Sequence, residues 1–279
     1  LHLAACESLV KRLVEVNCIA IAYETITSPG GSLPLLAPMS EVAGKVAVQA
    51  GANCLHKYDG GRGILLGGVP GVKPGNIVII GGGVVGTSAA QVASGIGANV
   101  TILDKCMDNI RTLNWKFGNN VNVLYASKEV LEDTIKNADL VIGAVLVPGD
   151  AAPKIVTEDM VKTMKKGAVI VDVSVDQGGC IETIKPTTHD NPFYEYEGVI
   201  HYGVTNMPSA VAYTSTRALE NVTLPYITEL ADMGYRLALK TNSHFRNGLN
   251  VYRGRITHEG VAKGLKQPYT PCRSILGTD

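Results

Sequence analysis

The stretch Asn76-Ile77-Val78-Ile79-Ile80-Gly81-Gly82-Gly83-Val84-Val85-Gly86 decides the fold of this chain. Its first five residues predict a buried strand, and its glycines then follow the spacing G-x-G-x-x-G. In that spacing Gly81 permits a tight turn, Gly83 lets the backbone approach a pyrophosphate, and Gly86 allows close packing of a helix on the strand. The start of that helix offers amide donors and the positive end of its dipole to a phosphate. The stretch therefore predicts a Rossmann-type nucleotide-binding unit.

The identity of the nucleotide follows from Asp104, which stands at the end of the next predicted strand, 18 residues after Gly86. A carboxylate at that place accepts hydrogen bonds from the hydroxyls of the adenosine ribose and repels a 2′-phosphate. We therefore expect NAD, rather than NADP, as the cofactor. A glycine turn without a ligand is the alternative, since the chain has 31 glycines. The strand before the loop, the helix after it and the acid beyond it argue against that alternative.

A βαβ rhythm surrounds the glycine loop. The predicted strands are nearly continuous apolar runs, as is typical of a parallel sheet covered on both faces. They span residues 76–80, 99–103, 121–125, 140–144, 168–173 and 199–204, with helices at 84–97 and 107–117. The fold class is therefore α/β: a Rossmann doubly wound parallel sheet plus part of a second α/β substrate domain.

The two ends of the chain follow a different pattern. Residues 3–15 predict a helix and 17–23 a strand, and a helix starts near Ser40, a good N-cap, and runs to about residue 55. After residue 213 the pattern is helical, at 218–232, 234–241 and 258–265, without a strand rhythm. We therefore assign an NAD-binding domain to residues 37–212 and a partial substrate domain to residues 1–36 and 213–279.

Composition excludes several classes of protein. The 25 basic residues balance the 25 acidic ones and form no stripe, which argues against a nucleic-acid partner. No apolar run reaches the length of a membrane span. The six cysteines are scattered without a CxxC pair, which is typical of reduced thiols in the cytoplasm. Neither HExxH nor a paired Cys/His pattern is present, so we predict no metal.

The candidates for chemistry are less sharply defined. A dehydrogenation needs a proton acceptor, and composition alone cannot choose among the six histidines. Asp172 and Asp176 close the strand in AVIVDVSVDQGG, at the sheet edge where ligands gather in this fold. Asp176 is placed to face the nicotinamide, although a turn-capping role before two glycines is equally compatible with the pattern. The glycine-rich segment 60–75 lacks the Gly-Lys-Ser/Thr ending of a P-loop and is interpreted as turns.

The chain resembles L-alanine dehydrogenases, of the alanine dehydrogenase and pyridine nucleotide transhydrogenase superfamily. The similar segments run almost from end to end, and many are long and idiosyncratic. They are LHLAA at 1–5, AIAYET at 20–25, LPLLAPMSEVAG at 33–44, GGRGILLGGVPGV at 60–72, IIGGGVVGT at 79–87, VTILD at 100–104, ADLVIGAVLVPG at 138–149, VDVSVDQGGC at 171–180, NMPSAV at 206–211 and GLN at 248–250.

This resemblance implies reversible oxidative deamination of L-alanine to pyruvate and ammonia, with NAD as hydride acceptor. It places the catalytic histidine on His2, as acid/base at the substrate oxygen, and the catalytic aspartate on Asp176, where it assists addition of water to the imine. It also implies a cytoplasmic homo-oligomer, most often a hexamer. The cofactor contacts that it implies, besides the glycine loop, are Ser40, Asp104, Val145, Leu146, Val173, Ser174, Val175, Asp176, Thr205, Asn206, Met207 and Pro208.

The sequence departs from the family pattern at several places. Asn109 stands where a basic residue is usual after the ribose acid, and Ala126 stands where a serine binds the cofactor. Glu229 matches a carboxylate that some members use for a metal, but its histidine companion is Met233. The resemblance also begins inside the family's sequence, ahead of which lie the arginine and lysine that hold the substrate carboxylate. We therefore expect negligible turnover from residues 1–279 alone, and activity from a full-length parent.

Two other functions compete with this interpretation. One is the NAD-binding domain of a proton-translocating transhydrogenase, which shares the fold; LHLAA, DQGG and the absence of a membrane span argue against it. The other is a truncated, non-catalytic NAD-binding fragment, which an upstream reading frame with a Met start and basic residues would exclude.

Overall fold

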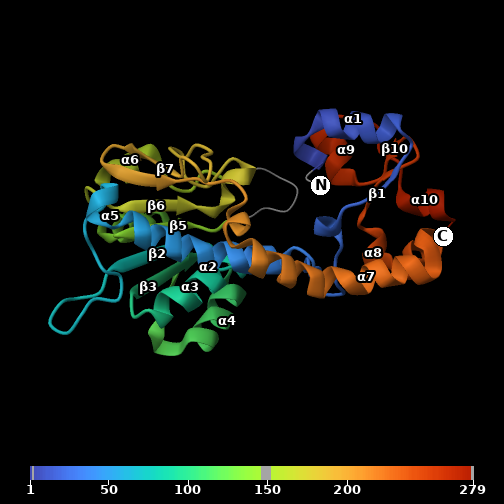
Figure 1. Ribbon diagram of the computed structural model, residues 1–279. Helices are drawn as coiled ribbons and strands as arrows, with labels where there is room; N and C mark the ends of the chain where they lie inside the picture. The colour runs from blue at the N-terminus through green and yellow to red at the C-terminus, as the bar shows by residue number, and fades with distance from the viewer. Residues whose placement is uncertain (2, 146–151, 278–279) are drawn as a thin grey trace. The chain divides into compact units, whose positions relative to one another are not determined.

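The computed structural model describes residues 1, 3–145 and 152–277, so the predicted site residues His2 and Leu146 lie outside the described part. The chain forms two compact units. We call Ser40–Ala212 the central unit, and Leu1–Met39 together with Tyr213–Asp279 the terminal unit. Figure 1 shows the elements of each.

The central unit is built on a seven-stranded sheet with the order β4-β3-β2-β5-β6-β8-β7. Every neighbouring pair is parallel except β7 and β8. The strands are β2 (Asn76–Ile80), β3 (Asn99–Asp104), β4 (Asn122–Tyr125), β5 (Leu140–Gly143), β6 (Val169–Asp172), β7 (Phe193–Tyr196) and β8 (Val199–Tyr202). Six of them confirm predicted strands. The seventh, β7, was not predicted, because this half-exposed edge strand lacks the apolar run of its buried neighbours.

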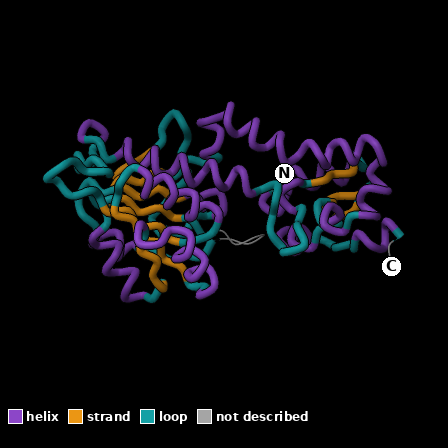
Figure 2. The backbone as a smooth tube through the Cα atoms, turned by 90° about the horizontal axis from the view of Figure 1, so that it is seen from below, coloured by secondary structure: helices purple, strands orange, loops and turns teal. Residues whose placement is uncertain are grey.

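Helices surround this sheet, and Figure 2 shows its strands lying between them. They are α2 (Ala37–Cys54), α3 (Val84–Gly95), α4 (Met107–Phe117), α5 (Lys128–Asn137) and α6 (Glu158–Thr163). The prediction of Ser40 as an N-cap is wrong, since α2 begins at Ala37 and Ser40 lies within its first turn. Pro38 explains the earlier start. Its ring fixes φ at a helical value, and a backbone N–H in the first turn of a helix has no acceptor within the helix, so proline loses no hydrogen bond there.

The terminal unit has a sheet of its own, with the order β1-β9-β10. Its strands are β1 (Ile19–Ile21), β9 (Leu249–Tyr252) and β10 (Arg255–Ile256), and its helices are α1 (Glu7–Glu15), α7 (Ala212–Thr241), α8 (Ser243–Arg246), α9 (Glu259–Leu265) and α10 (Cys272–Leu276). Short 3-10 turns include Leu3–Ala5 and Tyr23–Thr25. A backbone break at Gly234 separates the two helices predicted over 218–241. No helix in the described ranges is long and apolar enough to cross a membrane.

The expectation of no strands after residue 213 is wrong, because β9 and β10 form an antiparallel hairpin there. Its two-residue turn is Arg253-Gly254, and both residues have positive φ, 43° and 81°. Such turns match the twist of a hairpin and usually carry Asn-Gly or Asp-Gly. With Arg in the first position, the usual sequence signal of a hairpin is missing.

A buried carboxylate ties the segment 60–75 to the amino-terminal edge of the central sheet. The side chain of Asp139, 5% exposed, pairs with Arg62 Nε at 3.3 Å and Lys165 Nζ at 3.1 Å. It also accepts the backbone N–H of Asn76 at 2.9 Å. The segment ends in turns, one of which places Gly71 at φ 85°. Asp139 therefore joins this segment to the first residue of β2.

We expect Asp139→Ala to lower the free energy of unfolding by about 2–3 kcal/mol, because the half-buried N–H of Asn76 and two half-buried cations lose this acceptor. Asp139→Asn keeps one acceptor oxygen and should cost less. Chemical denaturation followed by circular dichroism measures both changes. Asp108→Ala, which removes an exposed ion pair with Arg111, is the control and should change stability little; an equal effect of both Ala variants would contradict the role of Asp139.

Candidate cofactor-binding and catalytic site

The glycine loop between β2 and α3 is shaped by backbone approaches that only glycine permits. Gly81 has φ 99°, and its N–H donates to the carbonyl of Leu103 at 2.8 Å. A Cβ on Gly86 would overlap the carbonyl oxygen of Gly81, whereas nothing lies within 4 Å of the Cβ position of Gly83. The loop is therefore closed on the side of the sheet and open at Gly83, the N-cap of α3. This is the geometry that a pyrophosphate needs at a helix start.

Asp104 lies directly beside this loop. Its Oδ2 accepts the N–H of Gly82 at 2.8 Å and the Asn109 side-chain amide at 3.1 Å. Its Oδ1 accepts the N–H of Cys106 at 2.7 Å. The carboxylate is half-buried and held by three donors, so its orientation is settled without a ligand. The structure thus brings Asp104 and the glycine loop together.

The ends of β5 and β6 lie next to the same loop. The Cβ position of Gly81 is 2.7 Å from the carbonyl oxygen of Ala144. One residue further on, the carbonyl of Val145 accepts the hydroxyl of Ser174 at 2.6 Å. Val145 and the run Val173–Asp176 therefore follow adjacent parallel strands at their carboxyl ends, where ligands bind in open α/β sheets.

Asp172, which is fully buried, holds the segment that follows β6 through hydrogen bonds. Its carboxylate accepts the backbone N–H of Ser174 at 2.9 Å and that of Ile181 at 3.1 Å. Burial raises the pKa of Asp172, and these two hydrogen bonds oppose the rise. Asp172 is therefore the turn-capping aspartate of this segment. The sequence pattern is equally compatible with a turn-capping role for Asp176.

Asp176 is instead exposed, in the 3-10 turn Val173–Gln177. Its Oδ2 receives a long hydrogen bond, 3.4 Å, from the N–H of Asn206. Asn206 has a left-handed backbone, with φ 52°. This contact joins the two predicted cofactor segments, Val173–Asp176 and Thr205–Pro208, in the central unit. It leaves most of the Asp176 carboxylate accessible.

A contact that sequence reasoning missed supports the second of these segments. The Ser209 hydroxyl donates to the carbonyl of Asn206 at 2.8 Å and lies 2.8 Å from Nε2 of His189. Since that hydroxyl has one hydrogen, it accepts from His189, whose Nε2 then carries the proton. No sequence signal links residues 189 and 209.

The structure also narrows the choice among the histidines. His201 is fully buried, and its two ring nitrogens lie 2.7 Å from Thr183 Oγ1 and 3.0 Å from the carbonyl of Val199. Burial lowers the pKa of His201. It is a structural histidine of the sheet. His244 is likewise engaged, through Thr27 Oγ1 at 2.9 Å.

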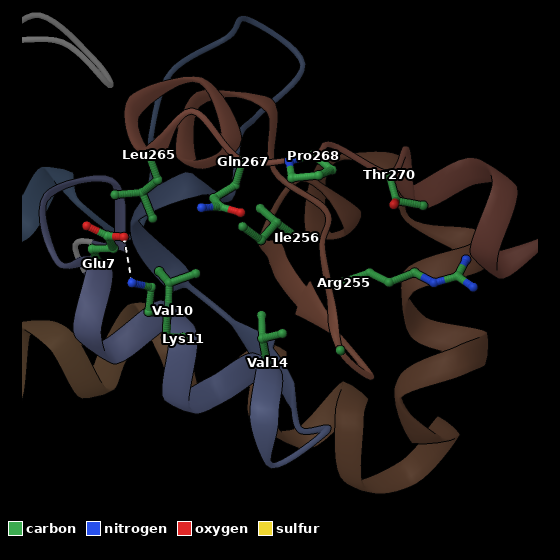
Figure 3. Close-up of a pocket in the computed structure, with 11 residues that line it drawn as sticks. Glu7, Val10, Lys11, Val14, Arg255, Ile256, Leu265, Gln267, Pro268 and Thr270 are labelled. Carbon is green, nitrogen blue, oxygen red and sulfur yellow. Dashed lines mark ion pairs between the residues drawn. The ribbon is translucent and has the colours of Figure 1, made fainter.

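Two further features concern sites away from the glycine loop. The described residues contain no group of three side chains suited to a metal ion. In the terminal unit, a cavity of about 320 Å³ lies between α1, β10 and residues 265–270. Figure 3 shows apolar side chains, among them Val10, Val14 and Leu265, together with polar ones in its lining. The ion pair of Glu7 and Lys11, 2.9 Å long, lies at one side. It contains none of the predicted site residues.

Comparison with known proteins identifies the family. The sequence profile described as "Alanine dehydrogenase/PNT, C-terminal domain" matches residues 47–259. Alanine dehydrogenase from Halomonas elongata is 54% identical over 277 residues, which cover 99% of this chain and 75% of that protein. The corresponding protein of Staphylococcus haemolyticus is 53% identical over 280 residues, 100% of this chain and 75% of its own length. The chain belongs to the alanine dehydrogenase family.

Solved structures agree with this assignment. An L-alanine dehydrogenase is 52% identical and matches with a TM-score of 0.91, over 95% of this chain and 73% of its own. A transhydrogenase from Sinorhizobium meliloti matches with a TM-score of 0.75 at 19% identity, over 91% of this chain and 72% of its own, which shows a shared fold alone. The family and the α/β Rossmann-type fold are thus confirmed, and the chain is a member of a pyridine nucleotide dehydrogenase family.

We expect Gly86→Ala to weaken NADH binding at least tenfold, because the added methyl group displaces α3 from the carbonyl of Gly81 and opens the pyrophosphate cradle. Fluorescence titration with NADH measures the effect. Gly95→Ala is the matched control: it lies in the same helix, and nothing is within 4 Å of its Cβ position. Equal NADH affinity in the two variants would contradict the expected close approach.

Proposed function

We propose that this protein is an NAD-dependent L-alanine dehydrogenase, which converts L-alanine and water reversibly to pyruvate and ammonia. The observation that carries the proposal is 54% identity, over 99% of the chain, to a curated alanine dehydrogenase. The glycine loop beside Asp104 supports a dinucleotide cofactor. A transhydrogenase domain receives no comparable support, since the likeness to one is 19% identity.

The residues of the central unit fit NAD. Gly83 leaves the start of α3 open, so the first amides of this helix are available to a pyrophosphate. The Asp104 carboxylate accepts three hydrogen bonds of its roughly four possible ones, which leaves an acceptor for a ribose hydroxyl. Val145, Ser174 and Thr205 would line the same edge of the sheet. The remaining proposed contacts are Ser40, Leu146, Val173, Val175, Asp176, Asn206, Met207 and Pro208.

In the proposed reaction the bound NAD supplies the hydride acceptor for the hydrogen on the substrate Cα. Asp176 is exposed, and among the described residues it receives one long hydrogen bond, from Asn206. It would take a proton from the water that adds to the imine. His2 would act as acid/base at the oxygen of the substrate. The products are pyruvate, ammonia and NADH, so that one hydride leaves the substrate for each nitrogen released. We propose no metal in this chemistry.

The oligomeric state and the cellular location of the enzyme are part of the same proposal. We infer a homo-oligomer, a hexamer by family resemblance, that works in the cytoplasm on a small amino acid, without a nucleic-acid or membrane partner. We also propose that residues 37–212 form the NAD-binding domain and that residues 1–36 and 213–279 are parts of a substrate domain. Size-exclusion chromatography with light scattering measures the oligomeric state.

The test is an assay of the product of the complete reading frame, with alanine, other small L-amino acids and glycine, using NAD and NADP separately. We expect alanine with NAD to be the best pair, since the relatives at 52–54% identity are alanine dehydrogenases. A different best amino acid would overturn the substrate assignment.

We expect Asp176→Asn to lower kcat by at least about a hundredfold, because the amide cannot accept the proton of the attacking water. NADH affinity should stay within a few-fold, since Asn has the size of Asp and keeps a side-chain oxygen that can accept the N–H of Asn206. Stopped-flow kinetics and NADH titration separate the two effects. Asp190→Asn, an exposed carboxylate of the same unit, should leave both unchanged; unaltered kcat in Asp176→Asn would remove this residue from the mechanism.

A further inference from the structure

The backbone turn at residues 177–181, which directly follows Asp176, depends on contacts from outside itself. Two of its residues, Gly178 and Gly179, have positive φ of 88° and 77°. Glycine adopts such angles without strain, but it also has more conformations available than any other residue. A turn with two adjacent glycines therefore needs further contacts to keep one conformation.

Lys154 supplies such contacts. Its Nζ donates to the carbonyl of Gly178 at 2.5 Å and to that of Ile181 at 3.1 Å. Hydrogen bonds from a charged donor are roughly twice as strong as those between neutral groups. Gly178 is also the C-cap of the 3-10 turn Val173–Gln177, and a lysine at such an end satisfies carbonyls that lack a partner. One ammonium group thus bridges two carbonyls across the 177–181 turn.

Lys154 acts together with the buried carboxylate of Asp172. The N–H of Ile181 donates to Asp172 at 3.1 Å, while the carbonyl of the same residue accepts from Lys154. Burial raises the pKa of Asp172, and its backbone hydrogen bonds and the positive charge of Lys154 oppose that rise. In the part of the chain that the structure describes, none of the ion pairs includes Lys154. Its ammonium group is therefore engaged by the backbone of the turn.

The direction of the Asp176 side chain depends on this backbone. From within the described residues its carboxylate receives one hydrogen bond, 3.4 Å long, from the N–H of Asn206. A contact of that length is weak and fixes a side chain poorly. Before Asp176 the backbone is held by Asp172, through the N–H of Ser174. After Asp176 it is held by Lys154. The direction of the carboxylate therefore follows from the two held ends.

We propose that Lys154 is a positioning residue, which directs the Asp176 carboxylate by holding the 177–181 turn. It acts through the backbone and needs no contact with the substrate. A displacement of about 1 Å can lower the rate of an enzyme about a hundredfold, so release of this turn lowers turnover while every catalytic side chain is still present. The inference rests on the proposed function, in which Asp176 takes a proton from water.

The experiment measures kcat for alanine oxidation and the dissociation constant of NADH. It uses the product of the complete reading frame and its variants Lys154→Met and Lys154→Arg. Methionine has a similar shape without a donor, so we expect Lys154→Met to lower kcat about tenfold or more. NADH affinity should stay within about threefold, because Asp172 still holds Ser174. Arginine keeps a cation with several donors, so Lys154→Arg should stay within about threefold of wild-type kcat.

A double-mutant cycle tests whether Lys154 acts through Asp176. In the Asp176→Asn background the carboxylate that Lys154 directs is absent. Lys154→Met should therefore lower kcat by less than about twofold in that background. A residue that merely stabilised the fold would lower kcat by the same factor in both backgrounds.

Lys166→Met is the matched control. Lys166 is likewise an exposed lysine, and its Nζ donates to the carbonyl of Glu197 at 2.6 Å. It precedes β6, whereas Asp176 follows that strand, so this variant should leave kcat and NADH affinity unchanged. Lys154→Gln, which also removes the charge, takes the place of Lys154→Met if circular dichroism shows that the latter does not fold, and it should lower kcat in the same direction.

The outcomes separate the inference from the proposed function. The positioning role would be overturned, and the enzyme assignment left intact, by any of three results: a kcat of Lys154→Met equal to that of wild type, equal losses in the two backgrounds, or no better kcat in Lys154→Arg than in Lys154→Met. Wild-type protein that does not oxidise alanine with NAD would overturn the proposed function itself, and the positioning role with it.

Discussion

The contact between Gly86 and the carbonyl of Gly81 is the constraint on which the rest of the central unit depends. It lets α3 start immediately above the end of β2, without room for a single methyl group between them. The start of the helix is thereby aimed over the carboxyl edge of the sheet. Because β3 and β5 lie on the two sides of β2, everything that follows those strands is brought to the same edge. Asp104 at the end of β3 and the segments after β5 and β6 therefore lie at the edge over which α3 starts.

Two carboxylates, Asp172 at the end of β6 and Asp176 after it, show how the environment of the same side chain changes what it can do. Asp172 is buried among backbone donors, and burial raises its pKa. Its hydrogen bonds hold the segment that carries Asp176, so its contribution is to geometry. Asp176, four residues later, is exposed and receives one long hydrogen bond from within the described residues. Only a carboxylate in that second situation is free to exchange a proton with a substrate or a water molecule.

Family membership and local geometry answer different questions about this chain. Identity above 50% with alanine dehydrogenases says which reaction to test. It does not say how this chain handles its own departures from the family pattern. At Asn109 the structure shows the side-chain amide donating to the Asp104 carboxylate at 3.1 Å. A departure that removes a positive charge in the sequence therefore keeps a hydrogen bond to Asp104 in the fold.

The sequence by itself determined the parallel sheet, the glycine loop and the place of Asp104, because long apolar runs and a glycine spacing are local properties of the chain. Strands β7, β9 and β10 escaped prediction, since a half-exposed edge and an Arg-Gly hairpin turn lack those local signals. Only the tertiary structure decided that Asp172 is the capping aspartate, that Asn109 reaches Asp104 and that His189 supports Asn206 through Ser209. Each of these depends on where a side chain points after the strands have been aligned, and no periodicity in a sequence encodes that direction.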